Sequence, residues 1–199
     1  MGKSEPIRNM QDIQRIKQYL LERKRWRDYA LIIMGLNTAL RISDLLQLKW
    51  GNVYNFQTLT FFQHIYVKEQ KTSKNSIVSI NNNVCDALKL LKDHLPMVSE
   101  ADYLFQSRLH GSRPIHRSRA YAIIREIAKD LDLKGIISCH SLRKTFGYHA
   151  WKQGYSPAII MEIYNHSSFQ VTRHYLSINQ DDKDQLYKNI MRTTYSKGY

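Results

Sequence analysis

The spacing of apolar residues changes twice along this 199-residue chain, and these changes limit the folds that it can adopt. In residues 9–24 apolar side chains recur every three or four positions, and Asn9 stands where it could cap the helix that this spacing predicts. Residues 26–36 predict a second helix, and Asn37 or Thr38 could cap a short third one. The first fifty residues are therefore expected to be helical.

Between residues 53 and 80 the pattern becomes typical of strands. The runs "TLTFFQHIYV" (58–67) and "SIVSI" (76–80) are separated by the polar stretch "KEQKTSKN", which predicts an antiparallel hairpin with a basic tip. Helical spacing then resumes in the segments 82–94, 117–131 and 141–152, and in a segment from the "SP" pair at 156–157 to about 164. We expect one compact α+β domain, mainly α-helical, with a small antiparallel sheet near residues 53–80.

The charge of the chain indicates its partner. It carries 30 Lys and Arg against 17 Asp and Glu, a net charge of +13, yet 43% of its residues are hydrophobic, which excludes a disordered basic tail. A folded protein with this charge attracts polyanions, of which nucleic acid is the first candidate and an anionic membrane the weaker one.

Cysteine usage and hydropathy bear on the location of the chain. Cys85 and Cys139 lie far apart and lack metal-ligand spacing, which argues against a disulfide scaffold or a zinc finger and fits a reducing cytoplasm. The longest apolar run, at 29–36, is too short to span a bilayer. A cytoplasmic protein that uses no membrane is therefore expected.

Four short segments place cationic or nucleophilic side chains at the ends of the expected elements. Each has an ordinary explanation by itself: a surface ion pair for an arginine, edge protection for hairpin lysines, capping for a histidine at a helix start, and a half-buried aromatic for a tyrosine. Only their combination indicates chemistry. The candidates are Arg41, one of Lys68, Lys71 and Lys74, His140 with Arg143, and His166 with Tyr175.

The order of these residues resembles the catalytic set of the tyrosine recombinase, or phage integrase, family. "TALRISDLLQL" resembles the family's first arginine box, "HSLRKTFGYHA" its second, and "NHSSFQVTRHYL" its nucleophile box. The likeness runs from about Arg27 to Tyr175. Asn165 stands where a glycine is common, and Lys144 where a second histidine is common. Carried over by position, the resemblance implies a site of Arg41, Lys71, His140, Arg143, His166 and Tyr175.

Of the six residues, the lysine is the one whose position the resemblance fixes least. "QKTSK" best resembles the family's turn, which selects Lys71, and Lys74 is the alternative. The resemblance implies that Tyr175 attacks a DNA phosphate to form a 3′-phosphotyrosyl bond, while Lys71 protonates the departing 5′ oxygen. Two arginines and a histidine would neutralise the phosphate, so that no metal and no other cofactor is expected.

The resemblance also implies double-stranded DNA as partner and a homotetramer acting on two duplexes. Residues 1–178 would form the catalytic domain, and residues 179–199 an amphipathic tail, through Leu186 and Ile190, that could pass to a neighbouring protomer. The forty residues before Arg41 are too few for a preceding DNA-binding domain, so we expect either a stand-alone catalytic domain or a fragment of a longer integrase. Two alternatives remain: a catalytically idle DNA-binding regulator with this fold, and a type IB topoisomerase.

Overall fold

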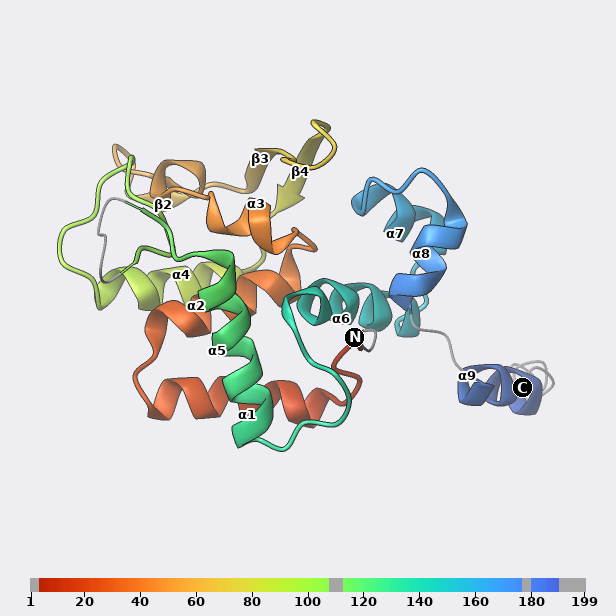
Figure 1. Cartoon of the computed structure of the whole chain (residues 1–199). Helices are drawn as coiled ribbons and strands as arrows, with labels where there is room; N and C mark the ends of the chain where they lie inside the picture. The colour runs from red at the N-terminus through yellow and green to blue at the C-terminus, as the bar shows by residue number, and fades with distance from the viewer. Residues whose placement is uncertain (1–3, 108–112, 177–179, 190–199) are drawn as a thin grey trace, which may run out of the picture.

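The computed structural model describes residues 4–107, 113–176 and 180–189, and its arrangement is shown in Figure 1. Helices dominate it. They are α1 (Met10–Glu22), α2 (Trp26–Asn37), α3 (Ile42–Leu46), α4 (Asn82–Asp93), α5 (Arg117–Asp130), α6 (Cys139–Lys152), α7 (Pro157–Ile163), α8 (Phe169–Leu176) and α9 (Gln180–Asn189). The strands are β1 (Tyr54–Asn55), β2 (Thr60–Phe61), β3 (His64–Lys68) and β4 (Asn75–Ser79), and a 3-10 turn covers Trp50–Asn52.

The strands pair as two small antiparallel sheets, β1 with β2 and β3 with β4. This confirms the expected α+β class, but the prediction of a single strand over 58–67 is wrong. The run divides at Phe62, whose N–H donates to the carbonyl of Val53 at 2.9 Å, whereas the carbonyl of the next residue, Gln63, accepts from Ile80 at 2.8 Å. Neighbouring residues thus bond to different segments, one next to β1 and one next to β4, and the apolar run does not reveal this division.

The short third helix begins later than the sequence indicates. Its N-cap is Arg41, because α2 continues to Asn37 and Thr38 serves as the C-cap of α2. The hydroxyl of Thr38 donates back to the carbonyl of Met34 at 2.7 Å, and Ala39 follows with a positive φ of 56°. The chain turns sharply at this point, which places Arg41 at the start of α3.

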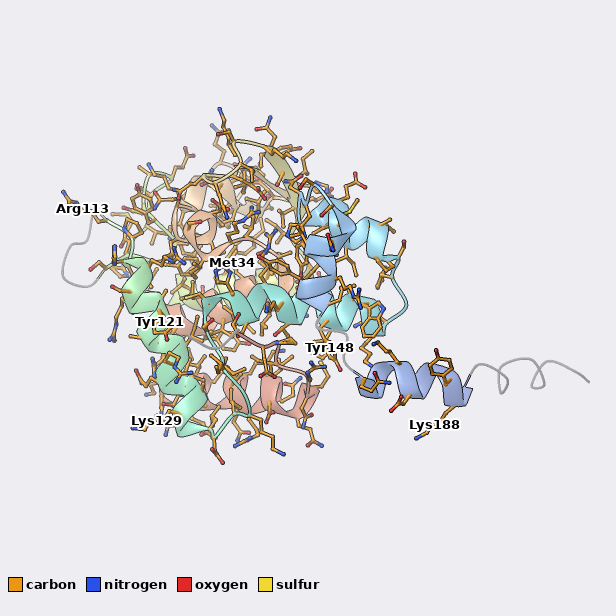
Figure 2. All side chains as sticks on the ribbon, turned by 45° about the vertical axis from the view of Figure 1, so that its right-hand side comes forward. Met34, Arg113, Tyr121, Lys129, Tyr148 and Lys188 are labelled. Atoms are coloured by element: carbon orange, nitrogen blue, oxygen red, sulfur yellow. The ribbon has the colours of Figure 1, made fainter. Side chains whose placement is uncertain are left out.

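Helix α2 is the centre of the core. Its side chains Leu31, Ile33 and Met34 are at most 1% exposed, and α2 packs against α1, α4 and α6. Figure 2 shows Met34 surrounded by the other elements. Each such buried side chain contributes roughly 1.5–3 kcal/mol of hydrophobic free energy. A smaller cluster, formed by Ala39, Ile160, Tyr164 and Leu176, lies where α6, α7 and α8 meet.

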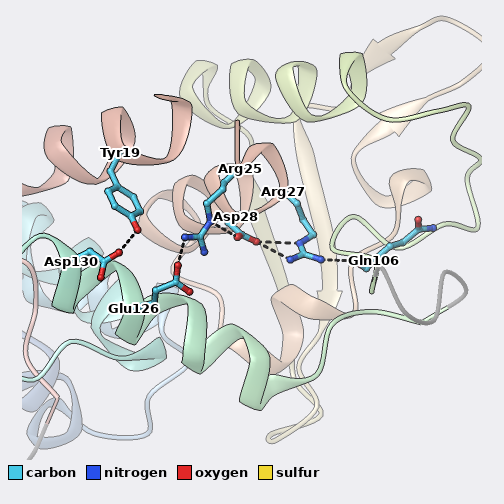
Figure 3. Close-up of polar contacts among 7 residues, drawn as sticks. All are labelled: Tyr19, Arg25, Arg27, Asp28, Gln106, Glu126 and Asp130. Atoms are coloured by element: carbon cyan, nitrogen blue, oxygen red, sulfur yellow. Dashed lines mark hydrogen bonds and ion pairs between the residues drawn. The ribbon is translucent and has the colours of Figure 1, made fainter. Parts of the chain in front are cut away.

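A chain of polar contacts joins the start of α2 to α5 (Figure 3). Asp28, only 6% exposed, pairs with Arg25 at 2.9 Å and with Arg27 at 3.1 Å, and Arg25 also contacts Glu126 of α5 at 2.5 Å. A buried carboxylate needs such partners, because an unpaired one would be strongly destabilising. We therefore assign these two arginines to the fold rather than to the site.

Helix α9 lies apart from the other described elements in both views (Figures 1 and 2). The expected boundary between residues 1–178 and 179–199 falls outside the described residues, as do Ile190 and the side chain of Leu186. Exchange of the tail therefore stays a prediction. Within the described part of the chain, none of the helices combines the length and the apolar character that a membrane crossing needs.

Candidate active site

Helix α6 carries the His-x-x-Arg motif in its first turns. It begins at Cys139, two residues earlier than expected, because a capping box joins Ser138 and Ser141, with the N–H of Ser138 donating to the Ser141 hydroxyl at 2.9 Å. His140 thus lies in the first turn and Arg143 one turn further along the helix. The two side chains are brought to the same end of α6.

The guanidinium of Arg143 is buried, with the residue only 2% exposed. It donates to the backbone carbonyls of Ala39 and of Tyr164, the latter at 2.8 Å, and it lies 4.4 Å over the centre of the Tyr164 ring. Its Nε has no hydrogen-bond partner among the described residues. Burial, and then the charge of Arg41, lowers the pKa of Arg143, so the two arginines interact electrostatically.

Tyr164 is a residue of this site that the sequence reasoning missed. It is fully buried, and its hydroxyl donates to the backbone carbonyl of Arg143 at 2.5 Å. A Cβ at Gly147 would lie 2.3 Å from that hydroxyl oxygen, so the glycine is needed for the ring to fit. A glycine inside a helix is the one sequence signal that could have indicated a close neighbour here.

The end of α7 places His166 next to this ring. The N–H of His166 donates to Met161 at 3.1 Å and that of Asn165 to Glu162 at 2.8 Å, the two bonds of a Schellman motif. Asn165 has the positive φ of 52° that this motif requires, which explains why asparagine can replace glycine there. The Nδ1 of His166 is 3.0 Å from the hydroxyl of Thr172.

Tyr175 lies on α8, a helix that the sequence analysis did not expect. Its ring is centred 4.7 Å from that of His166 and 5.1 Å from that of Tyr164, and the guanidinium of Arg143 lies 5.8 Å from its ring centre. Burial lowers the pKa of His166 to about 4, with the charges of Arg143 and Arg41 adding to the effect. His166 is therefore neutral at pH 7.

Arg41 pairs with a second residue that the sequence reasoning missed. Its Nη1 lies 2.6 Å from an oxygen of Glu69, which is only 2% exposed and also accepts from the hydroxyl of Thr72 at 2.5 Å. Burial by itself would raise the pKa of Glu69, but its polar contacts with Thr72, Arg41 and Asn165 lower it below its ordinary value. Glu69 is the only acid in "KEQKTSK" (68–74), a signal that could have indicated it.

Lys71 is exposed in the turn between β3 and β4. Loss of hydration lowers the pKa of His140, and the positive charges of Arg117, Lys144, Arg143 and Lys71 lower it further. Lys71 thus comes within electrostatic range of His140. Lys144 donates to the carbonyl of Ser4 at 2.5 Å.

The structure thus brings Arg143, His166 and Tyr175 into one cluster, with Arg41 close enough to act on its charges. Lys71 and His140 are exposed, and the charges of Arg143 and Lys71 act on the His140 ring. Among the described residues, no group of three or more His, Cys, Asp or Glu side chains could hold a metal ion. The catalytic assignment of the six residues stays a prediction.

Comparison with known proteins identifies the family. Residues 9–182 match the model of the phage integrase family. The probable integrase/recombinase YoeC of Bacillus subtilis is 39% identical over 185 residues, which are 92% of this chain and 95% of YoeC. Among solved structures, XerA recombinase matches with a TM-score of 0.75 and 23% identity, and XerH recombinase with 0.74 and 18%. Each match covers 96% of this chain.

The two solved chains are longer than this one, which spans 66% of the XerA chain and 55% of the XerH chain. At these identities the structural matches support the fold, and they confirm the expected α+β domain. The family match over most of the chain and the close relative carry the assignment itself. On these grounds the chain belongs to the phage integrase family, as its two arginine boxes and its nucleophile box indicated.

Proposed function

We propose that this chain is a site-specific DNA recombinase that cleaves and rejoins strands through a 3′-phosphotyrosyl intermediate on Tyr175. The observation that carries the proposal is the cluster of Tyr175, His166 and the buried Arg143, in which a nucleophile lies beside groups that bind phosphate. The net charge of +13 supports a DNA partner, and XerH, a structural relative, was solved bound to its difH substrate after cleavage.

The cations of the site suit a phosphodiester. Negative charge builds up on the non-bridging oxygens in the transition state, and guanidinium groups match phosphate geometry with two donors each. Arg41 and Arg143 would supply these donors, with the Nε of Arg143 unpartnered among the described residues. The paired Glu69 holds Arg41 without neutralising Arg143, so the site keeps a net positive charge.

Each proton in the proposed step has a donor and an acceptor. The Tyr175 oxygen attacks phosphorus, the bond from phosphorus to the 5′ oxygen breaks, and Lys71 gives a proton to that oxygen. The lowered pKa of His140 leaves its ring neutral at pH 7, so that it can accept the tyrosine proton. His166 would hydrogen-bond the phosphate. Attack by a 5′ hydroxyl of another strand reverses the step and joins a new partner.

This scheme uses no metal ion, and we propose that the reaction is metal-independent and cytoplasmic. Exchange of strands between two duplexes needs four nucleophiles, so we propose a homotetramer on two duplexes. Residues 1–178 would form its catalytic domain, and the tail 179–199 could link protomers. The charge of Lys71 acts on His140, which supports Lys71 as the general acid.

A library of nicked duplexes with a randomised centre tests the proposal whatever the target sequence is. A nick a few nucleotides downstream of the scissile bond lets the short fragment that carries the new 5′ hydroxyl diffuse away, which traps any covalent product. We expect a protein–DNA adduct that survives denaturation, forms in the presence of EDTA and yields a common sequence when its DNA is read. The matched control is Tyr175→Phe, which lacks only the nucleophilic oxygen.

Binding to the library without any adduct would contradict the proposal and favour the idle DNA-binding regulator. If the protein forms the adduct and relaxes supercoiled plasmid but does not join two duplexes, the topoisomerase would be favoured. Loss of the adduct in EDTA would refute metal independence alone, because the tyrosine chemistry would stand.

A further inference from the structure

Asn165 joins two segments of the site that are far apart in the sequence. Its side-chain Nδ2 donates to the hydroxyl of Ser76 at 2.7 Å, across 89 positions of the chain. Ser76 belongs to β4, in the hairpin whose turn carries Lys71. Asn165 directly precedes His166 and comes just before α8, which carries Tyr175. In Figure 1 the β3–β4 hairpin lies on the side of the molecule that faces α7.

The hydrogen bonds continue from Ser76 to the first arginine. The Ser76 hydroxyl donates to Glu69 at 3.4 Å, and the other oxygen of Glu69 lies 2.6 Å from Arg41. Asn165 is also among the polar groups that lower the pKa of Glu69. One polar path thus connects α3, the hairpin and the segment of the nucleophile.

The backbone of Asn165 does not require this side chain. At a φ of 52° glycine carries no steric penalty, whereas asparagine is only tolerated. Asparagine at such a position is therefore best explained by what its amide binds. The amide is in turn matched by a hydroxyl placed at hydrogen-bond distance on a strand of a different segment.

Building on the function proposed above, we infer that Asn165 is a positioning residue for the reaction. Its bond to Ser76 holds the segment of His166 and Tyr175 at a fixed distance from the hairpin of Lys71. Nucleophile and general acid must lie on opposite sides of one phosphate, and small displacements of reacting groups slow such steps strongly. The bridge sets that separation before DNA binds.

The experiment compares Asn165→Gly, Ser76→Ala and the double variant on the nicked DNA sequence selected from the library. Asn165→Gly keeps the positive φ and removes only the amide, so relief of backbone strain should offset part of the lost hydrogen bond and the variant should fold with a midpoint of urea unfolding close to that of the wild type. We expect each single variant to form the adduct about five to ten times more slowly, with the DNA Kd changed less than twofold.

The double variant should be no slower than the slower single variant, because both changes break one interaction. Ser76→Thr keeps the hydroxyl on the strand and should restore the rate to within about twofold of the wild type. A rate of Asn165→Gly equal to that of the wild type would overturn the inference. Slowing factors that multiply in the double variant would overturn it as well.

A readout without DNA separates this inference from the proposed function. In the free protein, the loss of the bridge should speed amide hydrogen exchange in residues 169–176 to the same extent in Asn165→Gly and Ser76→Ala. Unchanged exchange in both variants would refute the bridge even if the wild type forms the adduct. If the wild type forms no adduct but exchange rises in both variants, the bridge holds and only its catalytic role falls with the proposed function.

Discussion

Acidification should destabilise this protein through His166, and the structure gives the size of the effect. The pKa of His166 is about 4 in the folded chain against an ordinary value of 6.5, because burial and two arginines oppose its charged form. Between these values the unfolded chain binds a proton that the folded chain does not, so stability falls as the pH drops from 6.5 towards 4. The stabilising contribution is complete above 6.5.

The magnitude follows from the difference in pKa. One pKa unit corresponds to about 1.4 kcal/mol, which gives a loss of about 2 kcal/mol between pH 7 and pH 5 from this group. The ring is half-buried, and solvent screening reduces the loss to about 1 kcal/mol. His140, whose pKa is also lowered, contributes in the same direction.

Urea unfolding of the wild type and of His166→Gln at pH 7, 6 and 5 measures this contribution. The variant lacks the titrating ring, so its free energy of unfolding should fall by about 1 kcal/mol less than that of the wild type over this range. His140 is present in both proteins and cancels from the difference. Curves that stay parallel from pH 7 to pH 5 would refute the reasoning, because His166 would then titrate alike in both states.

Three further changes test single contacts of the site. Gly147→Ala should lower the free energy of unfolding by about 1–3 kcal/mol, because its Cβ would meet the Tyr164 hydroxyl at 2.3 Å. In a Tyr164→Phe background the same change should cost less in thermal unfolding, although the ring carbons would still lie 3.0–3.1 Å from the Cβ. An equal loss in both backgrounds would contradict this contact. Tyr175→Phe should bind the nicked library like the wild type and form no adduct, whereas an adduct would place the nucleophile elsewhere. Lys71→Ala should slow cleavage at least tenfold on ordinary DNA, but not on DNA in which sulfur replaces the leaving 5′ oxygen, because a sulfur leaving group needs no acid. Lys74→Ala is the matched control. If Lys74→Ala is slow and Lys71→Ala is normal, Lys74 is the general acid instead.

Elements with strong local signals could be predicted from the sequence. Asn9 accepts a hydrogen bond at the start of α1, and Ser156 with Pro157 opens α7, both as expected. Helix α8 has no comparable signal, because "FQVTRHYL" is short and contains β-branched residues. It is held instead by burial of Thr172 and Leu176, which are both fully buried in the folded chain. Such tertiary support cannot be read from local periodicity.

The residues of the candidate site were likewise predictable only in part. A resemblance in order and spacing indicated six residues, but it did not indicate Glu69 or Tyr164. These two act through packing between segments: Glu69 of the hairpin reaches Arg41 at 2.6 Å, and Tyr164 lies under the guanidinium of Arg143. A pattern along one chain does not show which segments meet. Two sequence signals remained, one acid in a lysine run and one glycine in a helix. Each indicates an unusual position, but neither indicates which residue lies next to it.

Burial is the larger cause of the lowered pKa values of the two histidines, and the positive charges that add to it are the ones that would bind a phosphate. Arg143 lowers the pKa of both, Arg41 adds to this at His166, and Lys71 adds to it at His140. This site therefore holds more positive charge than Glu69 can compensate. An anion placed among these groups would raise both pKa values, so DNA binding should be accompanied by uptake of protons below pH 6.5. Affinity for DNA should accordingly increase on mild acidification, in the same range of pH in which the free protein loses stability.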